Sequence, residues 1–312
     1  MSVSREIIDV VIPVYNDSKY LNETLISLLK QILPKGWKIN IIIVDDGSEY
    51  PVILEKNISQ LHQVTLVRLE KNQGRGRACN IGAETGDGEL IYFIDVDCIL
   101  RNKYTIMSHF ECISQVSAAV SCGQICCRGD GFWSRYQMQV ALRRERSYLE
   151  GNHASLTSAN FMIKRDVFNL IGGFDKSFSY YGFEDRDLFL SIIEKKFHIF
   201  FCQKALVEHV SELSLASITN KLKNAGRYSS LVFKEKHPEY YQNSMYSSLD
   251  FSGKRGISSL AFILGPFLFI LSHGFDLLEK SNLMPFFIGR YIVKIVSGLG
   301  YMQGTIQSSK SR

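Results

Sequence analysis

The sequence lacks the features that mark several large classes of protein. Its 312 residues carry a formal net charge of only +5, too small an excess to predict nucleic-acid binding but compatible with an anionic ligand or membrane face. Mean hydropathy is −0.01, so the chain is not a polytopic membrane protein. No internal repeat is visible, and 46% apolar with 21% charged residues is a globular composition. The length predicts two modules, or one large unit with an appendage.

Secretion and disulfide signals are also missing. Residues 1–15 contain no charged segment followed by a long apolar one, so no signal peptide is expected. The seven cysteines are odd in number and scattered, which predicts free thiols in a reducing cytoplasm. Cys122, Cys126 and Cys127 have neither a second pair nor a nearby histidine, so they do not predict a tetrahedral zinc site.

The first hundred residues alternate strand-like and helix-like patterns. Runs rich in β-branched residues at Ile7–Val14 and Ile39–Val44 are typical of parallel strands buried on both faces, and Thr65–Leu69 and Leu90–Ile94 are predicted as a third and a fourth strand. Apolar residues at helical spacing occupy positions 21–32. Strands separated by helices predict an α/β fold with a doubly wound sheet.

Polar residues follow three of these predicted strands. They are Tyr15 to Asp17, Asp45 to Ser48, and Asp95 to Asp97. Open α/β sheets bind ligands beyond the carboxyl ends of their strands, so these groups would meet at one edge. Acids gathered there need a divalent cation, or hydrogen bonds to ribose and base, to offset their repulsion. The alternative is that Asp45 and Asp46 only shape a turn.

Two segments near the fourth strand are suited to a diphosphate. Asp95 and Asp97 project to the same side of an extended chain, so one carboxylate can hold a metal ion while the other reaches the ribose or shares the metal. The glycine-rich segment 72–82 contains Arg75 and Arg77, which suit close approach to a diphosphate, although a solvated basic loop is the alternative. No Walker loop is present, and the first strand is not followed by a dinucleotide-binding glycine motif.

A candidate general base lies further along the chain. Residues 182–187 place three acids within four positions, just before an apolar-periodic helix. Compensation of the helix dipole is the alternative, but three acids exceed what capping requires. His209 lies in a short predicted strand, Leu206–Val210, where a lone histidine is more often structural than a ligand.

Taken in order, these segments resemble glycosyltransferase family 2, the inverting transferases with the GT-A nucleotide-sugar fold. The resemblance covers residues 7–215 and implies a doubly wound mixed sheet with a C-terminal helical, apolar extension. Many members have Arg-Asn where this chain has Cys79-Asn80, so Arg75 or Arg77 would supply that positive charge. The matching segments are VVIPVYND (10–17), IIIVDDGS (41–48), NQGRGRACNIGAETGDGELIYFIDVD (72–97), SANFMIKRDVFNLIGGFD (158–175), GFEDRDLFL (182–190) and His209.

The resemblance implies a nucleotide-binding role for residues at three strand ends. Pro13 and Tyr15 would frame or stack on the base. Asp46, together with Asp45, would bind uracil or ribose. Asp95 would contact the nucleotide of the donor, which we expect to be a UDP-sugar.

The resemblance also implies the catalytic and metal-binding residues. Asp97 and His209 would hold Mn²⁺ or Mg²⁺ on the diphosphate, and a nitrogen ligand beside carboxylates slightly favours manganese. Asp185 corresponds to the catalytic base, and Glu184 beside it would bind the acceptor sugar. The expected enzyme is an inverting, hexosyltransferase-type glycosyltransferase of polysaccharide biosynthesis, acting on a hydroxyl of a glycan or a lipid-linked saccharide.

The C-terminal part of the chain differs in composition from the rest. Residues 256–275 contain no Asp, Glu, Lys or Arg, and Gly265-Pro266 at their centre would kink a helix. A second apolar stretch, 283–301, carries Arg290 and Lys294. A spanning helix, a monotopic hairpin on the membrane surface and a helical cap on the catalytic domain are all compatible with this pattern.

We therefore expect a catalytic domain at 1–233, a polar linker at 234–255 and a membrane-associated apolar extension at 256–312. The expected location is cytoplasmic, at the inner face of the cell membrane.

Two other functions remain open from the sequence. A nucleotidyltransferase would carry a glycine-rich, basic signature after the first strand, where this chain has PVYNDSKY. An inactive sugar- or nucleotide-binding subunit of a glycan-assembly complex would have lost Asp95, Asp97, Asp185 or His209. All four are present.

Overall fold

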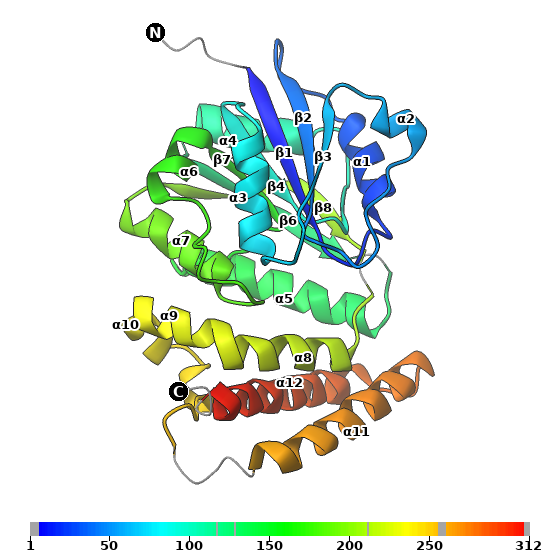
Figure 1. The fold of residues 1–312 in the computed structure, drawn as a ribbon, viewed down its shortest axis with the longest axis vertical. Coiled ribbons are helices and arrows are strands. Elements are labelled where there is room, and N and C mark those ends of the chain that lie inside the picture. The colour runs from blue at the N-terminus through cyan, green and yellow to red at the C-terminus, as the bar shows by residue number, and fades with distance from the viewer. Residues whose placement is uncertain (1–5, 117, 128, 211, 255–259, 309–312) are drawn as a thin grey trace. The chain divides into compact units, whose positions relative to one another are not determined.

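The computed structural model describes residues 6–116, 118–127, 129–210, 212–254 and 260–308 (Figure 1). The chain divides into two compact units. The first comprises Met1–Gly129, Gln137–Lys176 and Asp185–Ser211. The second comprises Asp130–Tyr136, Ser177–Glu184 and Glu212–Arg312.

An eight-stranded mixed sheet in the order β3-β2-β1-β4-β7-β6-β8-β5 forms the centre of the first unit. Strands β1 to β4 are parallel, β7 is antiparallel to both β4 and β6, β8 is parallel to β6, and β5 is antiparallel to β8. The chain order reverses between β1 and β4, which is where open α/β sheets bind ligands. The strands are β1 (Ile7–Val14), β2 (Lys38–Asp45), β3 (Val64–Arg68), β4 (Leu90–Ile94), β5 (Cys98–Leu100), β6 (Val120–Cys127), β7 (Asn160–Lys164) and β8 (Ile199–His209).

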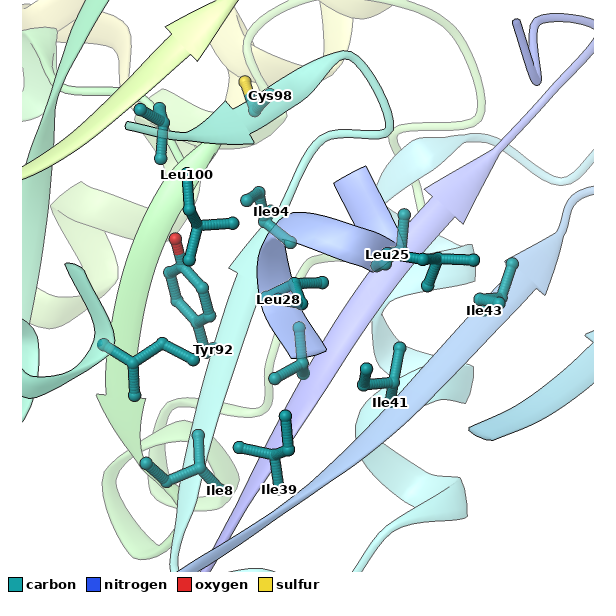
Figure 2. Packing of buried hydrophobic residues seen from close by; sticks show 14 of the residues in the cluster. Ile8, Leu25, Leu28, Ile39, Ile41, Ile43, Tyr92, Ile94, Cys98 and Leu100 are labelled. Carbon is teal, nitrogen blue, oxygen red and sulfur yellow. The ribbon is translucent and has the colours of Figure 1, made fainter. Parts of the chain in front are cut away.

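Helices cover both faces of this sheet. Alternate side chains of the parallel strands pack against Leu25 and Leu28 of α1 (Figure 2), while Ile42 and Val44 on the other face pack against Ala78 of α3. Strands β1, β2 and β4 are buried over most of their length because both faces are covered, whereas the edge strand β3 is largely exposed. The α-helices that lie wholly or mainly in the first unit, whether or not they cover the sheet, are α1 (Leu21–Leu29), α2 (Lys56–Ser59), α3 (Arg75–Thr85), α4 (Thr105–Gln115), α5 (Phe132–Leu149), α6 (Arg165–Ile171) and α7 (Glu184–Glu194).

The expected α/β mixed sheet is confirmed. Strands β1 and β4 have the predicted bounds, and the predicted strand at 39–44 lies within β2. The short strand expected at Leu206–Val210 is instead the end of an eleven-residue strand, β8.

A register shift separates the two halves of the β6–β8 pairing. Gly123 pairs with Cys202, but the next residue, Gln124, pairs with Leu206. Three residues of β8, 203–205, therefore lie in a bulge opposite no residue of β6. A bulge bends its strand and leaves backbone groups without ladder partners.

Asn160 of β7 supplies the missing hydrogen bonds at this bulge. Its amide nitrogen donates to the carbonyl oxygens of Gln124 (3.1 Å) and Ala205 (2.8 Å). Its Oδ1 accepts from the Tyr92 hydroxyl (2.8 Å) and lies 2.9 Å from Nε2 of His109. Burial lowers the pKa of His109 to about 4, so its ring is neutral near pH 7.

The second unit is helical. Its core contains Leu215, Leu264, Val293 and Ile306 among other apolar side chains. The backbone of α12 approaches that of α8 closely, since a Cβ on Gly304 would lie 2.0 Å from the Lys223 carbonyl oxygen. The elements are α8 (Leu215–Asn224), a π-helical turn η2 (Ala225–Ser229), α9 (Ser230–Lys236), α10 (Pro238–Gln242), η3 (Ser247–Leu249), α11 (Leu260–Lys280) and α12 (Phe286–Ser308).

The structure divides the C-terminal part differently from the predicted linker and extension. Residues 234–254 include α10 and η3, and Tyr241 is buried with its hydroxyl 2.9 Å from that of Tyr301. This segment is therefore part of the second unit. Residues 256–259 of the predicted apolar extension lie outside the described residues. Among the helices that the structure describes, none has the length and apolarity needed to cross a bilayer.

Candidate active site

The loops that follow β1 and β2 are tied together by Asn16. Its backbone N–H donates to the Ser48 hydroxyl (2.9 Å), and its side-chain oxygen accepts from the backbone N–H of Glu49 (2.8 Å). Tyr15 next to it is 49% exposed, whereas Pro13 is buried within β1. Of the two residues expected to frame a base, Tyr15 thus offers an accessible ring.

Asp45 has both of its carboxylate oxygens engaged within the loop that it begins. Oδ1 accepts from the Ser48 N–H (2.9 Å), and Oδ2 accepts from the Val52 N–H (3.1 Å) and Arg68 Nη1 (2.5 Å). Burial acts to raise the pKa of Asp45, but these hydrogen bonds and the Arg68 charge outweigh it and lower the pKa. These contacts hold the turn after β2, and the nucleotide-binding role expected of Asp45 stays a prediction.

Asp46 is buried and holds the start of α3. Its oxygens accept from the backbone N–H groups of Gln73 (2.8 Å) and Gly74 (2.9 Å). Burial raises the pKa of Asp46, and those two hydrogen bonds only partly offset this effect. Gly47 has φ +71°, and a Cβ there would lie 2.4 Å from the Lys71 carbonyl carbon. Only glycine therefore lets the two loops approach this closely.

Arg75, the first residue of α3, links two of the predicted site carboxylates. Its Nε and Nη2 donate to Oδ1 of Asp95 (2.9 and 2.6 Å). Its Nη1 donates to the Ser158 hydroxyl (2.8 Å) and to Oδ1 of Asp185 (3.3 Å). The side chains of Arg75, Asp95 and Asp185 are 25%, 28% and 25% exposed, so a ligand can reach this group.

Arg77 does not join that group through any contact seen here. Its Nε donates to Oε1 of Gln73 (3.1 Å), one turn away on the same segment. Cys79, two residues further along α3, is fully buried. The side chain of Asn80, the next residue, hydrogen-bonds to both backbone groups of Phe174. Its Nδ2 donates to the Phe174 carbonyl oxygen (2.7 Å), and its Oδ1 accepts from the Phe174 N–H (2.9 Å).

Asp185 lies in the first turn of α7 and is oriented by the segment before β7. Its Oδ1 accepts a short hydrogen bond from the Ser158 hydroxyl, and Oδ2 accepts from the Ser158 N–H (3.2 Å) and the Thr157 hydroxyl (3.0 Å). Glu184, the residue before it, is buried. Thr157 and Ser158 were not predicted as site residues. The signal that could have indicated them is their position just before the buried strand β7, since polar residues at strand ends often form sites.

Asp97 and His209, the residues expected to bind a metal ion, lie beside each other. Oδ2 of Asp97 lies 3.3 Å from Nε2 of His209, and their side chains are 17% and 21% exposed. The pairing of β5 with β8 sets Cys98 opposite His209, and ligand atoms of all three residues lie within 4.8 Å of one another. A carboxylate and an imidazole are donors that suit Mn²⁺, so the residues present fit a divalent cation. Cys98 was not predicted.

The model of the family described as "Glycosyl transferase family 2" matches residues 9–172, which is more than half of the chain. The chain belongs to glycosyltransferase family 2. A second model, described as "N-terminal domain of galactosyltransferase", matches residues 140–214 and so includes Asp185 and His209.

Individual relatives agree with this assignment. The glycosyltransferase GlyG of Streptococcus pneumoniae is 36% identical over 100 residues, which are 31% of this chain and 32% of that protein. The match thus spans about a third of that relative's length.

Two solved structures show the GT-A fold. TarS residues 1–349 from Staphylococcus aureus aligns with TM-score 0.53 and 18% identity over 97% of this chain and 91% of that one. The mannosyltransferase PcManGT of Pyrobaculum calidifontis, solved with GDP-Man and Mn²⁺, aligns with TM-score 0.55 and 15% identity over 93% and 85%.

Proposed function

We propose that the chain is an inverting glycosyltransferase that moves a sugar from a nucleotide-diphosphate sugar to a hydroxyl of a glycan or lipid-linked acceptor. The observation that carries this proposal is the chain of contacts from Asp95 through Arg75 to Asp185. These contacts support the proposal because Arg75, which we propose binds the diphosphate, bridges the two carboxylates that we propose contact the nucleotide and act as the base.

Asp185 is the proposed general base. Its carboxylate would take the proton of the acceptor hydroxyl as that oxygen attacks the anomeric carbon from the side opposite the leaving group, so configuration inverts in one displacement. Ser158 and Thr157 would hold the carboxylate in place during this transfer. Arg75 would donate to diphosphate oxygens, and Glu184 would bind the acceptor sugar.

Asp97 and His209 are the proposed ligands of Mn²⁺ or Mg²⁺. When bound, the cation would offset negative charge on the departing nucleoside diphosphate. Asp95 would position the ribose, and Tyr15, with Pro13 behind it, would contact the base.

The donor is proposed to be a UDP-sugar, with GDP-sugars as the class to test against it. PcManGT was solved with GDP-Man. A relative from Staphylococcus aureus is named poly(ribitol-phosphate) β-N-acetylglucosaminyltransferase TarS. It is 36% identical over 100 residues, which make up 31% of this chain and 17% of that protein. Both names guide the choice of donors to screen.

The deciding experiment is a screen of UDP- and GDP-sugars with Mn²⁺, read as release of nucleoside diphosphate and as thermal stabilisation. Asp185→Asn should lower turnover by about 10²–10⁴-fold because a carboxylate base contributes about that much, while donor binding stays near the wild-type level. Turnover unchanged in this variant would remove Asp185 from the role. Binding of a nucleotide sugar without any turnover would favour an inactive binding subunit.

We further infer that the second unit attaches to the inner face of the cell membrane without crossing it. Helix α12 contains Arg290 and Lys294 and no acidic residue, and Lys280 ends α11. Basic residues among exposed apolar ones are typical of helices that lie in an anionic membrane interface. The large exposed apolar side chains are Ile263, Phe267, Phe269, Ile270, Leu271, Leu277 and Leu278 of α11, Leu283 between the helices, and Phe287, Ile288, Tyr291 and Ile295 of α12.

Sedimentation with lipid vesicles tests this attachment. The protein should pellet with vesicles that contain phosphatidylglycerol and bind weakly to phosphatidylcholine alone. Replacing Phe269 and Ile270 by serine should reduce binding, whereas Ile53→Ser, which alters an 85% exposed side chain of the first unit, should not. Equal losses in both variants, or no binding by the wild type, would exclude this surface as a membrane contact.

A further inference from the structure

Cys98 lies beside the two residues proposed to hold the divalent cation, although the proposed reaction gives it no role. It pairs with His209 across β5 and β8, and Leu100 two residues further on pairs with Val207. Residues paired across antiparallel strands project from the same face of a sheet, and side chains two positions apart on one strand share a face. Leu100 and Val207 belong to the same buried core cluster as Cys98. Cys98 and His209 therefore project from one face.

Backbone hydrogen bonds hold Asp97 and Cys98 at this end of β8. The Asp97 carbonyl oxygen accepts from the Val210 N–H (2.9 Å), and the Cys98 N–H donates to the Asp95 carbonyl oxygen (3.0 Å). Oδ2 of Asp97 lies 3.3 Å from Nε2 of His209. One donor atom from each of Asp97, Cys98 and His209 lies within 4.8 Å of the other two. The main chain thus brings three different donors together.

The chemistry of these donors favours some cations over others. Carboxylate oxygen suits Mg²⁺ and Mn²⁺, imidazole nitrogen suits Zn²⁺ and other late transition metals, and thiolate sulfur selects Zn²⁺ over the oxygen-preferring cations. Oxygen, nitrogen and sulfur donors all occur in zinc sites, and three protein ligands leave a further position open to a substrate oxygen. The set formed by Asp97, Cys98 and His209 is therefore better matched to a thiophilic cation than Asp97 and His209 alone.

We propose that Cys98 is a third protein ligand of this site and gives it a preference for thiophilic divalent cations, with Zn²⁺ as the natural occupant of that class. The inference rests on the proposed function in taking Asp97 and His209 as the other two ligands. Mn²⁺ or Mg²⁺ is held by Asp97 and His209, and the thiol stays protonated because burial and the nearby carboxylates raise the pKa of Cys98. Zn²⁺ takes the sulfur as well, and the thiol proton passes to solvent as the sulfur–metal bond forms.

The extra ligand changes the charge that the site offers to a diphosphate. With Mn²⁺ one carboxylate offsets one of the two positive charges, so one remains. With Zn²⁺ the Asp97 carboxylate and the Cys98 thiolate together offset both. The attraction for a diphosphate is therefore weaker with Zn²⁺, and we expect Zn²⁺ to compete with Mn²⁺ for the same residues.

Cobalt is the probe of choice, because Co²⁺ occupies zinc sites and its absorption spectrum reports a sulfur ligand. One equivalent of Co²⁺ added to the reduced full-length protein should produce a thiolate-to-cobalt charge-transfer band in the near ultraviolet. Cys98→Ser should lose this band and still bind Co²⁺ weakly, as seen in the visible d–d bands. Cys126→Ser is the matched control and should keep the band, because Cys126 is a half-buried cysteine that pairs with Glu208 rather than with His209.

Competition between cations gives a second measurement that needs neither donor nor acceptor. Electron paramagnetic resonance of unbound Mn²⁺ follows its displacement from the protein by added Zn²⁺. The Zn²⁺ concentration that displaces half of the Mn²⁺ should rise at least about tenfold in Cys98→Ser, because loss of a ligand should cost at least as much as loss of a group that only supports one. The affinity for Mn²⁺ itself should change by less than about threefold, since Mn²⁺ prefers oxygen donors.

The possible failures are distinguishable. Visible d–d bands without a charge-transfer band in the wild type, or a charge-transfer band that persists in Cys98→Ser, overturns the role of Cys98 and leaves the proposed transferase function intact. Absence of any Co²⁺ or Mn²⁺ binding overturns both. If Cys98→Ser does not fold, X-ray absorption of the wild-type protein with one equivalent of Zn²⁺ replaces it. A sulfur neighbour at about 2.3 Å supports the proposal, and a shell of only nitrogen and oxygen overturns it.

Discussion

Replacing Arg75 by alanine removes four hydrogen bonds: two to Asp95, one to Ser158 and one to Asp185. A hydrogen bond to a charged group contributes about 1.5–3 kcal/mol, but these side chains are about a quarter exposed, so solvent screening places the contribution at the low end. Donors from Arg75 to the diphosphate, as proposed above, fall in the same range, so with the hold on Asp185 also lost we expect about 2–4 kcal/mol less transition-state stabilisation. This corresponds to a fall of about 30- to 1,000-fold in kcat/KM.

Arg77 provides the matched control because it lies two residues away on the same helix and carries the same charge. Its side chain donates a hydrogen bond to Gln73 of the same segment, so Arg77→Ala should change kcat/KM by less than about threefold. Arg75→Lys should be intermediate, since an ammonium keeps the charge but cannot reproduce the fork of donors on Asp95 and Ser158.

The assay is the initial rate of nucleoside diphosphate release from the donor found in the screen, measured over a range of donor concentrations. Circular dichroism and the melting temperature establish that each variant is folded. The reasoning is refuted if Arg75→Ala retains kcat/KM within about threefold of the wild type, or if Arg77→Ala loses as much activity as Arg75→Ala.

Three further predictions concern metal binding and stability. His209→Ala should abolish stabilisation by Mn²⁺ in a thermal shift assay, since Asp97 alone is a weak ligand set. Arg165→Met leaves the buried carboxylate of Asp9 without its ion-pair partner and should lower the free energy of unfolding in urea by about 3–5 kcal/mol. As the pH falls below 6.5, His109 is protonated in the unfolded chain before it is protonated in the folded chain. This difference should lower the free energy of unfolding by about 3 kcal/mol between pH 6.5 and 4. His109→Gln should remove the part of the pH dependence that is due to this histidine.

Each of these has an outcome that contradicts it. Retained Mn²⁺ stabilisation in His209→Ala would place the cation elsewhere. A cost below about 1 kcal/mol for Arg165→Met would mean that water or a neighbouring donor replaces the guanidinium. An unchanged pH slope in His109→Gln would assign the slope to carboxylates.

Strand bounds were predictable where the chain is uniformly apolar. Ile7–Val14 and Leu90–Ile94 are buried on both faces, so their boundaries coincide with changes in polarity. Strand β8 was found only in part because its residues 203–205 lie in a bulge, which breaks the alternation on which prediction depends. The packing of Tyr241 could not be foreseen either, since its partner Tyr301 lies sixty residues further along the chain.

The site was predictable to a similar extent and for similar reasons. Parallel strands bring their carboxyl ends to one edge, which accounts for finding the loops after β1 and β2 in contact. Composition could not distinguish Arg75 from Arg77, because which one points at Asp95 depends on the phase at which α3 begins. Ser158 reaches Asp185 through the antiparallel placement of β7, a tertiary relation that local pattern does not encode.

The bulge in β8 has a consequence for how this enzyme tolerates changes in chain length. Side chains of a strand alternate between the two faces of the sheet. The number of residues at 203–205 therefore helps to decide on which face of the sheet the His209 imidazole lies, compared with the side chains of the first half of β8. A deletion or insertion of two residues there preserves that phase. A change of one residue reverses it and should turn the imidazole away from Asp97, although the proposed metal ligands are all still present in the sequence.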